Sequence, residues 1–193
     1  MGRGWAGVAE RAGLSGVAGH GGASLGGWMP MGDLDGGLSL DLRWGFALDP
    51  LSAVMILVVT GVGFLIHVYS VGYMAHEPDV SRFFVYMNLF MAMMCTLVLG
   101  NNLLVMFVGW EGVGLCSYLL IGFWYSDRFN AYCGSKAFIV NRIGDFGFLV
   151  GIFLLFSALS SAGVPTLTFR EIAEHFDKIA AMTIAVPDWL PWP

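Results

Sequence analysis

One carboxylate, Glu111, lies in an almost uninterrupted apolar stretch at residues 102–125, NLLVMFVGWEGVGLCSYLLIGFWY. A segment of this length and apolarity can cross a bilayer, where a central charged residue costs about 2.5–3.5 kcal/mol on insertion scales. Glu111 shares a helical face with Gly114 and Tyr118, and its own helix carries no basic residue. The carboxylate must therefore be protonated, hydrated or paired with a cation elsewhere. This indicates proton or ion transfer, with a purely structural carboxylate as the alternative.

Two further charged residues, Arg142 and Asp145, lie inside the apolar sequence KAFIVNRIGDFGFLVG. Together they would cost about 6 kcal/mol in a membrane helix if nothing compensated them. At i,i+3 they share one face and can pair, and Asn141 lies four residues before Asp145 and could donate to it. The pair is interpreted either as an internal ion pair that orients the helix or as part of a proton path.

His67 is the remaining candidate for proton transfer that the residues themselves suggest. It shares a face with Thr60 and Gly63, and a histidine there could relay protons. A hydrogen bond between helices is the other interpretation. The sequence contains no phosphate loop, zinc motif, nucleophile triad or haem ligand pair. Three cysteines without paired spacing are interpreted as packing residues or free thiols: Cys95, Cys116 and Cys133.

The composition is that of a membrane protein. Of the 193 residues, 57% are hydrophobic and 12% charged, whereas soluble domains average about 25% charged. Four apolar runs each approach the roughly 20 residues that a membrane-spanning helix needs, and none alternates like a barrel strand. The predicted fold class is therefore an all-α membrane protein with about four transmembrane helices. The runs cover residues 51–69, 83–99, 103–125 and 137–159.

Local signals refine the first and last of these runs. Asp49 is placed to cap the first helix, and Pro50 occupies a favourable first position. In the last run, small residues at helical spacing predict close packing against another helix. These residues are Gly144, Gly147 and Gly151.

The chain divides into three predicted regions. Residues 1–48 form a Gly-rich N-terminal segment and extramembrane loop, residues 49–160 form the four-helix transmembrane region, and residues 161–193 form an amphipathic helix and a truncated tail. Alternation of apolar and polar residues at 38–50 predicts a short extended segment. In the last region, Thr168 and Glu171 match a capping box for a helix over about 169–180.

Charge predicts orientation and excludes one class of partner. Arg82, Arg128 and Lys136 flank the loops after the first and third spans, whereas the turn at 100–102 has no basic residue. The positive-inside rule therefore places residues 74–82 and 126–136 in the cytoplasm. A formal net charge of −5 argues against nucleic-acid binding.

The chain resembles the large antiporter-like subunit of respiratory complex I, NADH:quinone oxidoreductase chain L or mitochondrial subunit 5. The stretches that carry the resemblance are HVYSVGYM, SRFFVYMNLF, NNLLVMFVGWEGVGLCSYLLIGFWY and KAFIVNRIGDFGF. The resemblance covers about residues 27–182, and GWEGVGLCSYLLIGFWY is its most specific block. It implies a partial helical bundle of the inverted-repeat type, with a polar axis at mid-membrane.

The resemblance also implies roles for individual residues. Glu111 matches the carboxylate of a proton half-channel, which in the family pairs with a buried lysine on a later helix. Arg142 and Asp145 match charged residues on the next helix that tune or relay the proton, and Lys136 and His67 match further family positions. These five residues are the candidates for proton transfer, with no cofactor-binding or metal site in the chain.

Partners and location follow from the same resemblance. It implies NADH, FMN, iron–sulfur clusters and quinone in partner subunits, other membrane-arm subunits as partners, and a lipid bilayer around the chain. The expected location is a bacterial inner membrane, with the mitochondrial inner membrane as the alternative. Family members are much longer, so we expect a fragment without the first two helices and the large C-terminal part, inactive by itself.

Three functions are kept open. The chain is a piece of the proton-translocating subunit of complex I, a subunit of a multisubunit cation/proton antiporter, or a membrane fragment that packs without translocating anything. An antiporter subunit would work without redox partners, whereas the complex I subunit would couple proton transfer to quinone reduction.

Overall fold

The computed structural model describes residues 21–34 and 38–176. Its elements in chain order are β1 (Gly21–Leu34), β2 (Leu38–Leu48), α2 (Pro50–Tyr73), α3 (Val80–Leu99), α4 (Leu103–Ile121), α5 (Arg128–Ser161) and α6 (Phe169–Glu174). The strands form an antiparallel hairpin, so the extended segment predicted within residues 38–50 is confirmed as β2. Within the described residues, four helices are long and apolar enough to cross a membrane. The predicted class, an all-α membrane protein, is confirmed, with the hairpin as an addition.

The helix starts are set by side-chain caps. The Asp49 carboxylate accepts from the backbone N–H of Ser52 at 2.6 Å, and Pro50 opens α2 as predicted. The Asn102 side chain caps α4. Asp127 accepts from the backbone N–H of Phe129 at 2.8 Å and starts α5. Each cap satisfies backbone donors that the first turn leaves free.

All four predicted spans differ at one or both ends from the observed helices, α2 Pro50–Tyr73, α3 Val80–Leu99, α4 Leu103–Ile121 and α5 Arg128–Ser161. The fourth was expected at 137–159, but the cap at Asp127 starts α5 earlier, and the helix runs for 34 residues. At 1.5 Å per residue it is about 51 Å long, well beyond the roughly 30 Å hydrocarbon core. The third was expected to continue to residue 125, whereas α4 ends at Ile121 and Gly122 follows as its C-cap.

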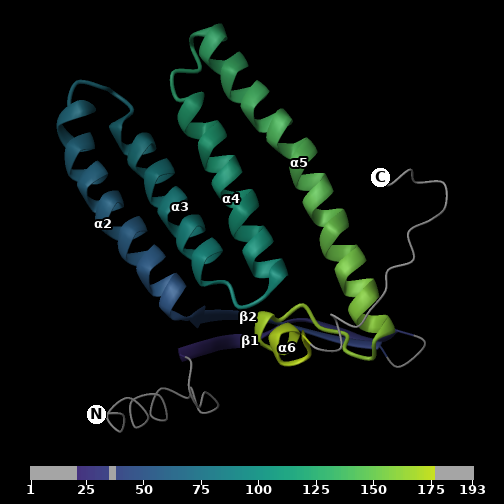
Figure 1. Ribbon diagram of the computed structural model, residues 1–193. Coiled ribbons are helices and arrows are strands. Elements are labelled where there is room, and N and C mark those ends of the chain that lie inside the picture. The colour runs from purple at the N-terminus through teal and green to yellow at the C-terminus, as the bar shows by residue number, and fades with distance from the viewer. Residues whose placement is uncertain (1–20, 35–37, 177–193) are drawn as a thin grey trace, which may run out of the picture.

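Helices α2, α3, α4 and α5 lie side by side in chain order as a row, with the hairpin and α6 at one end (Figure 1). A row one helix thick leaves large apolar side chains uncovered, such as Leu51 at 73% and Ile143 at 72% exposed. In a bilayer, lipid covers this surface, and each helix satisfies its own backbone hydrogen bonds. The loops that precede α3 and α5 lie at the end opposite the hairpin (Figure 1), and their cytoplasmic placement stays a prediction.

Main-chain hydrogen bonds join three distant segments at the hairpin end. The N–H of Asn101 donates to the carbonyl of Gly45 in β2 at 3.2 Å, and the N–H of Phe169 donates to the carbonyl of Asn101 at 3.2 Å. The N–H of Leu103 donates to the carbonyl of Leu167 at 3.0 Å. The hairpin, the α3–α4 turn and the start of α6 are thus held together, which positions the start of α4 beside the hairpin.

Helix α6 is shorter and capped differently than expected. It spans Phe169–Glu174, and the Thr168 side chain makes no capping hydrogen bond, so the predicted capping box is wrong. The N–H of Thr168 instead donates to the hydroxyl of Thr166 at 3.1 Å. Arg170 and Glu174, at i,i+4 on this helix, form an ion pair at 2.8 Å. The predicted continuation beyond residue 176 lies outside the described residues, as do residues 1–20 and 35–37.

Close helix packing occurs at different glycines from those predicted. A Cβ built on Gly144, Gly147 or Gly151 meets nothing within 4 Å, so this stripe packs against no part of the described chain. On α4, by contrast, a Cβ on Gly109 would lie 2.5 Å from the backbone nitrogen of Leu97 in α3. The backbones of α3 and α4 therefore touch here, two residues before Glu111.

We expect Gly109→Ala to separate α3 from α4. Real Cβ atoms do not approach backbone atoms this closely, and a backbone cannot yield as a flexible side chain can. The expected loss of unfolding free energy is about 3 kcal/mol, measured by thermal unfolding in detergent micelles. The control is Gly114→Ala on the same helix, where a Cβ meets nothing within 4 Å. Equal stabilities of the two variants would contradict the packing described.

Candidate functional site

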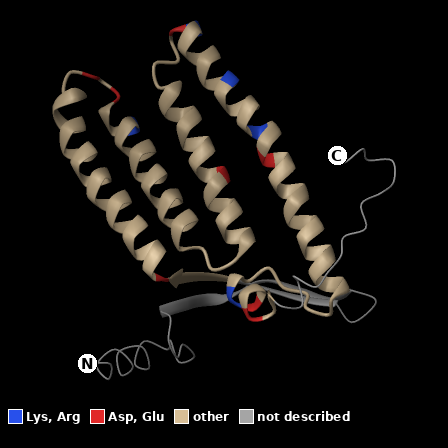
Figure 2. Cartoon of the chain, viewed as in Figure 1, with Lys and Arg blue, Asp and Glu red and all other residues tan. Residues whose placement is uncertain are grey.

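The central feature of the site is an ion pair between neighbouring helices. The Arg142 guanidinium on α5 contacts the Glu111 carboxylate on α4. Figure 2 shows charged residues within the length of both helices, away from the charged loop that joins α4 to α5. The Glu111 side chain is 22% exposed and the Arg142 side chain 43% exposed. Of the options left open by the sequence for Glu111, the structure shows pairing with a cation on another helix.

A second carboxylate, Asp145, lies beside this pair. Its Oδ2 is 4.0 Å from Arg142 Nη1, so the predicted i,i+3 pair exists only at the limit of contact, and the nearer partner of Arg142 is Glu111. Asp145 is 8% exposed, and its Oδ1 accepts a hydrogen bond of 2.7 Å from the indole nitrogen of Trp110. The donor to Asp145 is thus Trp110 of α4, whereas the expected donor Asn141 is exposed.

Two carboxylates and one guanidinium give the cluster a particular chemistry. With both carboxylates ionised, Glu111, Arg142 and Asp145 carry a formal charge of −1, which one bound proton would neutralise. In a medium of low dielectric, an uncompensated charge is costly. The N–H of Trp110 offsets part of it at Asp145, and a carboxylate that Arg142 leaves favours a bound proton or another cation. Within the described residues, no group of three or more His, Cys, Asp or Glu side chains is arranged to hold a metal ion.

Aromatic side chains position the cation. The Arg142 guanidinium lies 4.5 Å from the centre of the Phe138 ring, one turn earlier on α5. The Tyr118 ring of α4 packs on the same Phe138 ring, with centroids 5.5 Å apart. Trp110 and Phe107 both contact Phe148, farther along α5. Aromatic contacts on both sides of the ion pair therefore hold α4 and α5 together around it.

His67 lies apart from this cluster, between α2 and α3. Its Nδ1 is 2.7 Å from the carbonyl oxygen of Gly63, and its ring centre is 6.1 Å from that of Phe84. Because a carbonyl only accepts, Nδ1 carries a hydrogen in this contact. Nε2 is buried and has no hydrogen-bond partner within the described part of the chain. The hydrogen bond observed is within α2, so the expected bond between helices is not found.

Lys136 also lies apart from the ion pair. It is exposed on α5, nearer the start of the helix than Arg142. The ion pairs formed among the described residues do not include it. The structure therefore brings together Glu111, Arg142 and Asp145 and leaves Lys136 and His67 at separate positions.

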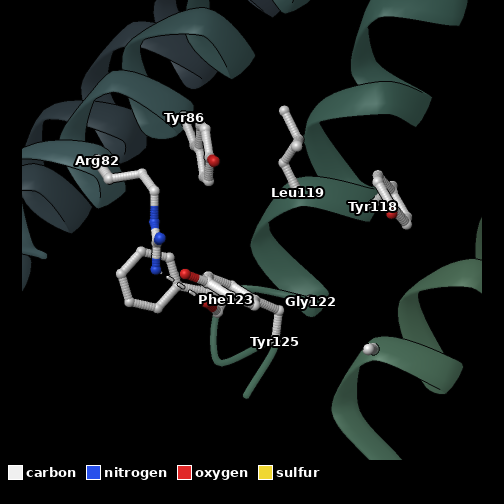
Figure 3. A pocket seen from close by; sticks show the side chains of 8 residues that line it. Arg82, Tyr86, Tyr118, Leu119, Gly122, Phe123 and Tyr125 are labelled. Atoms are coloured by element: carbon white, nitrogen blue, oxygen red, sulfur yellow. Dashed lines mark hydrogen bonds between the residues drawn. The ribbon is translucent and has the colours of Figure 1, made fainter. Parts of the chain in front are cut away.

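A cavity of about 200 Å³ lies between the start of α3 and the end of α4 (Figure 3). Arg82 lines it, lying 4.8 and 4.9 Å from the ring centres of Phe123 and Tyr125. The Arg82 side chain also pairs with Asp79 at 3.0 Å and donates to the carbonyl of Phe123 at 3.2 Å. With its charge balanced by Asp79, Arg82 acts as a tether between α3 and the loop after α4, not as an anion site.

Trp110 is the residue of this site that reasoning from the sequence missed. It stands next to Glu111 in the chain and lies at the α4–α5 contact, where its N–H reaches Asp145. An indole donor beside an intramembrane carboxylate was the available signal, because an indole N–H shielded from water usually finds an acceptor. Which carboxylate it would reach depends on the packing of α4 against α5.

The fold and the site define a class: a multi-pass membrane protein with paired charges between two of its spanning helices. Two family models match the chain. The model described as NADH-Ubiquinone oxidoreductase (complex I), chain 5 N-terminus, matches residues 28–84, and the model described as NADH:quinone oxidoreductase/Mrp antiporter, TM, matches residues 100–186. The chain belongs to this family of membrane subunits.

Curated relatives are similar in sequence to most of this chain. NADH-quinone oxidoreductase subunit L of Mycobacterium tuberculosis is 54% identical over 140 residues, 71% of this chain and 21% of the relative. Subunit L of Escherichia coli is 52% identical over 147 residues, 76% of this chain and 22% of the relative. Subunit 5 of the NAD(P)H-quinone oxidoreductase of Paulinella chromatophora is 50% identical over 151 residues, 78% of this chain and 22% of the relative. The chain thus spans about a fifth of the length of these relatives.

Proposed function

We propose that the chain is part of the proton-translocating membrane-arm subunit of an NADH:quinone oxidoreductase, in which Glu111 carries the proton. The observation that carries this proposal is the contact between Glu111 and Arg142 in the membrane-spanning part of two adjacent helices. Relatives named as subunit L of this enzyme support the assignment to the complex.

The chemistry proposed is the uptake and release of a proton at the Glu111 carboxylate. A guanidinium in contact favours the ionised carboxylate, because opposite charges stabilise one another. When Arg142 moves away, the carboxylate loses that compensation and binds a proton. When the cation returns, the proton leaves. Asp145, 4.0 Å from Arg142, provides an alternative ion-pair partner for the guanidinium. Lys136 and His67 are proposed as more distant members of the path.

The cofactors and partners belong to the complex as a whole. We propose that NADH, FMN, iron–sulfur clusters and quinone are bound by partner subunits, and that this chain contacts other membrane-arm subunits and lipid. The many bacterial relatives support a bacterial inner membrane as the location. Proton movement at Glu111 is then driven by redox chemistry elsewhere in the complex.

A chimeric subunit tests this proposal. The residues of this chain that match Escherichia coli subunit L replace the corresponding 147-residue segment of that protein, in a strain that lacks its own subunit. We expect the chimera to assemble and to restore NADH-driven proton pumping in membrane vesicles. An assembled complex that oxidises NADH and pumps no better than one lacking the subunit would contradict the proposal.

A cation/proton antiporter subunit is the second candidate. The description of the family model that matches residues 100–186 also names Mrp antiporters, which supports it. The same vesicles distinguish the two functions. An antiporter would exchange protons for an imposed sodium gradient without NADH, whereas the proposed function requires NADH oxidation.

A further inference from the structure

Among the described residues, Trp110 makes the hydrogen bond that links α4 to Asp145. Its indole N–H donates to Asp145 Oδ1 at 2.7 Å, and its ring lies 5.9 Å from that of Phe148. The residue that follows it, Glu111, contacts Arg142. Trp110 therefore holds one carboxylate of the cluster, while its neighbour in the chain provides the other.

Arg142 has two carboxylates within reach, and they compete for it. Glu111 contacts the guanidinium, whereas Asp145 Oδ2 stays 4.0 Å from Nη1, although Asp145 is three residues away on the same helix. A hydrogen bond to an ionised acceptor is stronger than a neutral one and fixes the acceptor's geometry. The indole N–H thus satisfies Asp145 and restrains its carboxylate short of full contact with Arg142.

Removal of the indole N–H changes the outcome of this competition. Asp145 is 8% exposed and cannot replace the lost donor with bulk water. The donor that it can then reach is the guanidinium of Arg142. The charged groups that face Glu111 across the α4–α5 contact are Arg142 and Asp145, and the α3 side of α4 presents Met93 and Leu97 at this level. A carboxylate that loses Arg142 here has no other described cation and takes up a proton.

We propose that Trp110 is a positioning residue for proton transfer: its hydrogen bond to Asp145 keeps Arg142 paired with Glu111. The inference rests on the proposed function for its biological meaning. The structural part of the proposal concerns only which carboxylate pairs with Arg142. This pairing can be measured in the chain by itself, without any proton pumping.

Infrared spectroscopy of the 193-residue chain in lipid nanodiscs at neutral pH tests the proposal. We expect Trp110→Phe to produce the C=O stretch of one protonated carboxyl per chain, absent from the wild type. The band should shift with 13C-labelled glutamate and not with 13C-labelled aspartate, and Glu111→Gln should remove it. In Trp110→Phe/Asp145→Asn the competing charge is gone, so Arg142 should stay on Glu111 and the band should be absent. The control is Trp124→Phe, on the loop after α4, which should show no band.

Two outcomes overturn the proposal. One is a wild-type spectrum from well-folded Trp110→Phe, and the other is a new band that shifts with labelled aspartate, since Asp145 itself would then hold the proton. If Trp110→Phe does not fold, benzothienylalanine at position 110 keeps the bicyclic shape and replaces the N–H with sulfur, and the same spectra decide. Wild-type pumping by Glu111 variants would contradict the proposed function and would leave these spectra unchanged, so failure here is separable from failure of the proposed function.

Discussion

Replacement of Glu111 by glutamine is expected to stop most proton transfer through this subunit and to leave assembly intact. The amide keeps the size of the side chain and can still accept a hydrogen bond from Arg142, but it cannot bind and release a proton. Groups that transfer protons typically contribute about 10²-fold or more to a rate, so the chimeric complex carrying Glu111→Gln should lose about that factor in proton transfer through this site. The measurement is the number of protons pumped per NADH oxidised in vesicles, alongside native-gel assembly.

Two further variants make the test specific. Glu111→Asp should retain part of the activity, because the charge persists on a shorter side chain. Glu77→Gln removes a carboxylate from the loop between α2 and α3, away from the ion pair, and should pump like the parent. Wild-type pumping by a fully assembled Glu111→Gln complex would mean that the carboxylate serves packing alone.

Replacement of Arg142 by glutamine is expected to destabilise the helix row more than any other single change to the cluster. It leaves Glu111 and Asp145 close together without their shared cation. Arg142 and Glu111 are 43% and 22% exposed within the chain, but both lie on membrane-spanning helices, where lipid and not water covers them. Removal of one partner of an ion pair shielded from water costs about 3 kcal/mol, because the remaining charge is uncompensated. At about 2–4 °C per kcal/mol for a chain of this size, the melting temperature in detergent should fall by about 6–12 °C.

A double variant separates the charge effect from loss of packing. Glu111→Gln/Arg142→Gln removes both charges of the pair and should recover most of the lost stability, since no carboxylate is then left without its cation at Glu111. If the double variant is as unstable as Arg142→Gln, the loss of stability comes from the missing contact between Arg142 and the Phe138 ring. That result would contradict the ion pair as the main stabilising contact.

The helices could be predicted from the sequence because their signals are local. Length and apolarity define the four spans, and Asp49 with Pro50 marks the start of α2 as observed. The ends were less predictable, since apolar residues continue past Ile121 where α4 stops and Asp127 starts α5 before the apolar run begins. Where a helix ends depends on backbone geometry at its caps, and hydropathy does not predict that position.

The site was predictable in its members and not in its pairing. Glu111, Arg142 and Asp145 stand out as charges in apolar runs, but the i,i+3 spacing favoured Arg142 with Asp145, whereas the contact formed joins Arg142 to Glu111. Side chains on different helices meet according to helix rotation and crossing, which local spacing does not determine. The same reason explains the glycines: Gly144, Gly147 and Gly151 have the favourable spacing, yet the close approach to α3 is made at Gly109.

The most direct test of the central claim is infrared difference spectroscopy of the chimeric complex during NADH oxidation. With 13C-labelled glutamate, the account predicts a carboxyl band that appears and disappears during turnover and that is missing from the Glu111→Gln complex. Such a band means that Glu111 binds and releases a proton as the enzyme works. A turnover spectrum identical in the parent and Glu111→Gln complexes would contradict the account, because Glu111 would then keep one protonation state throughout.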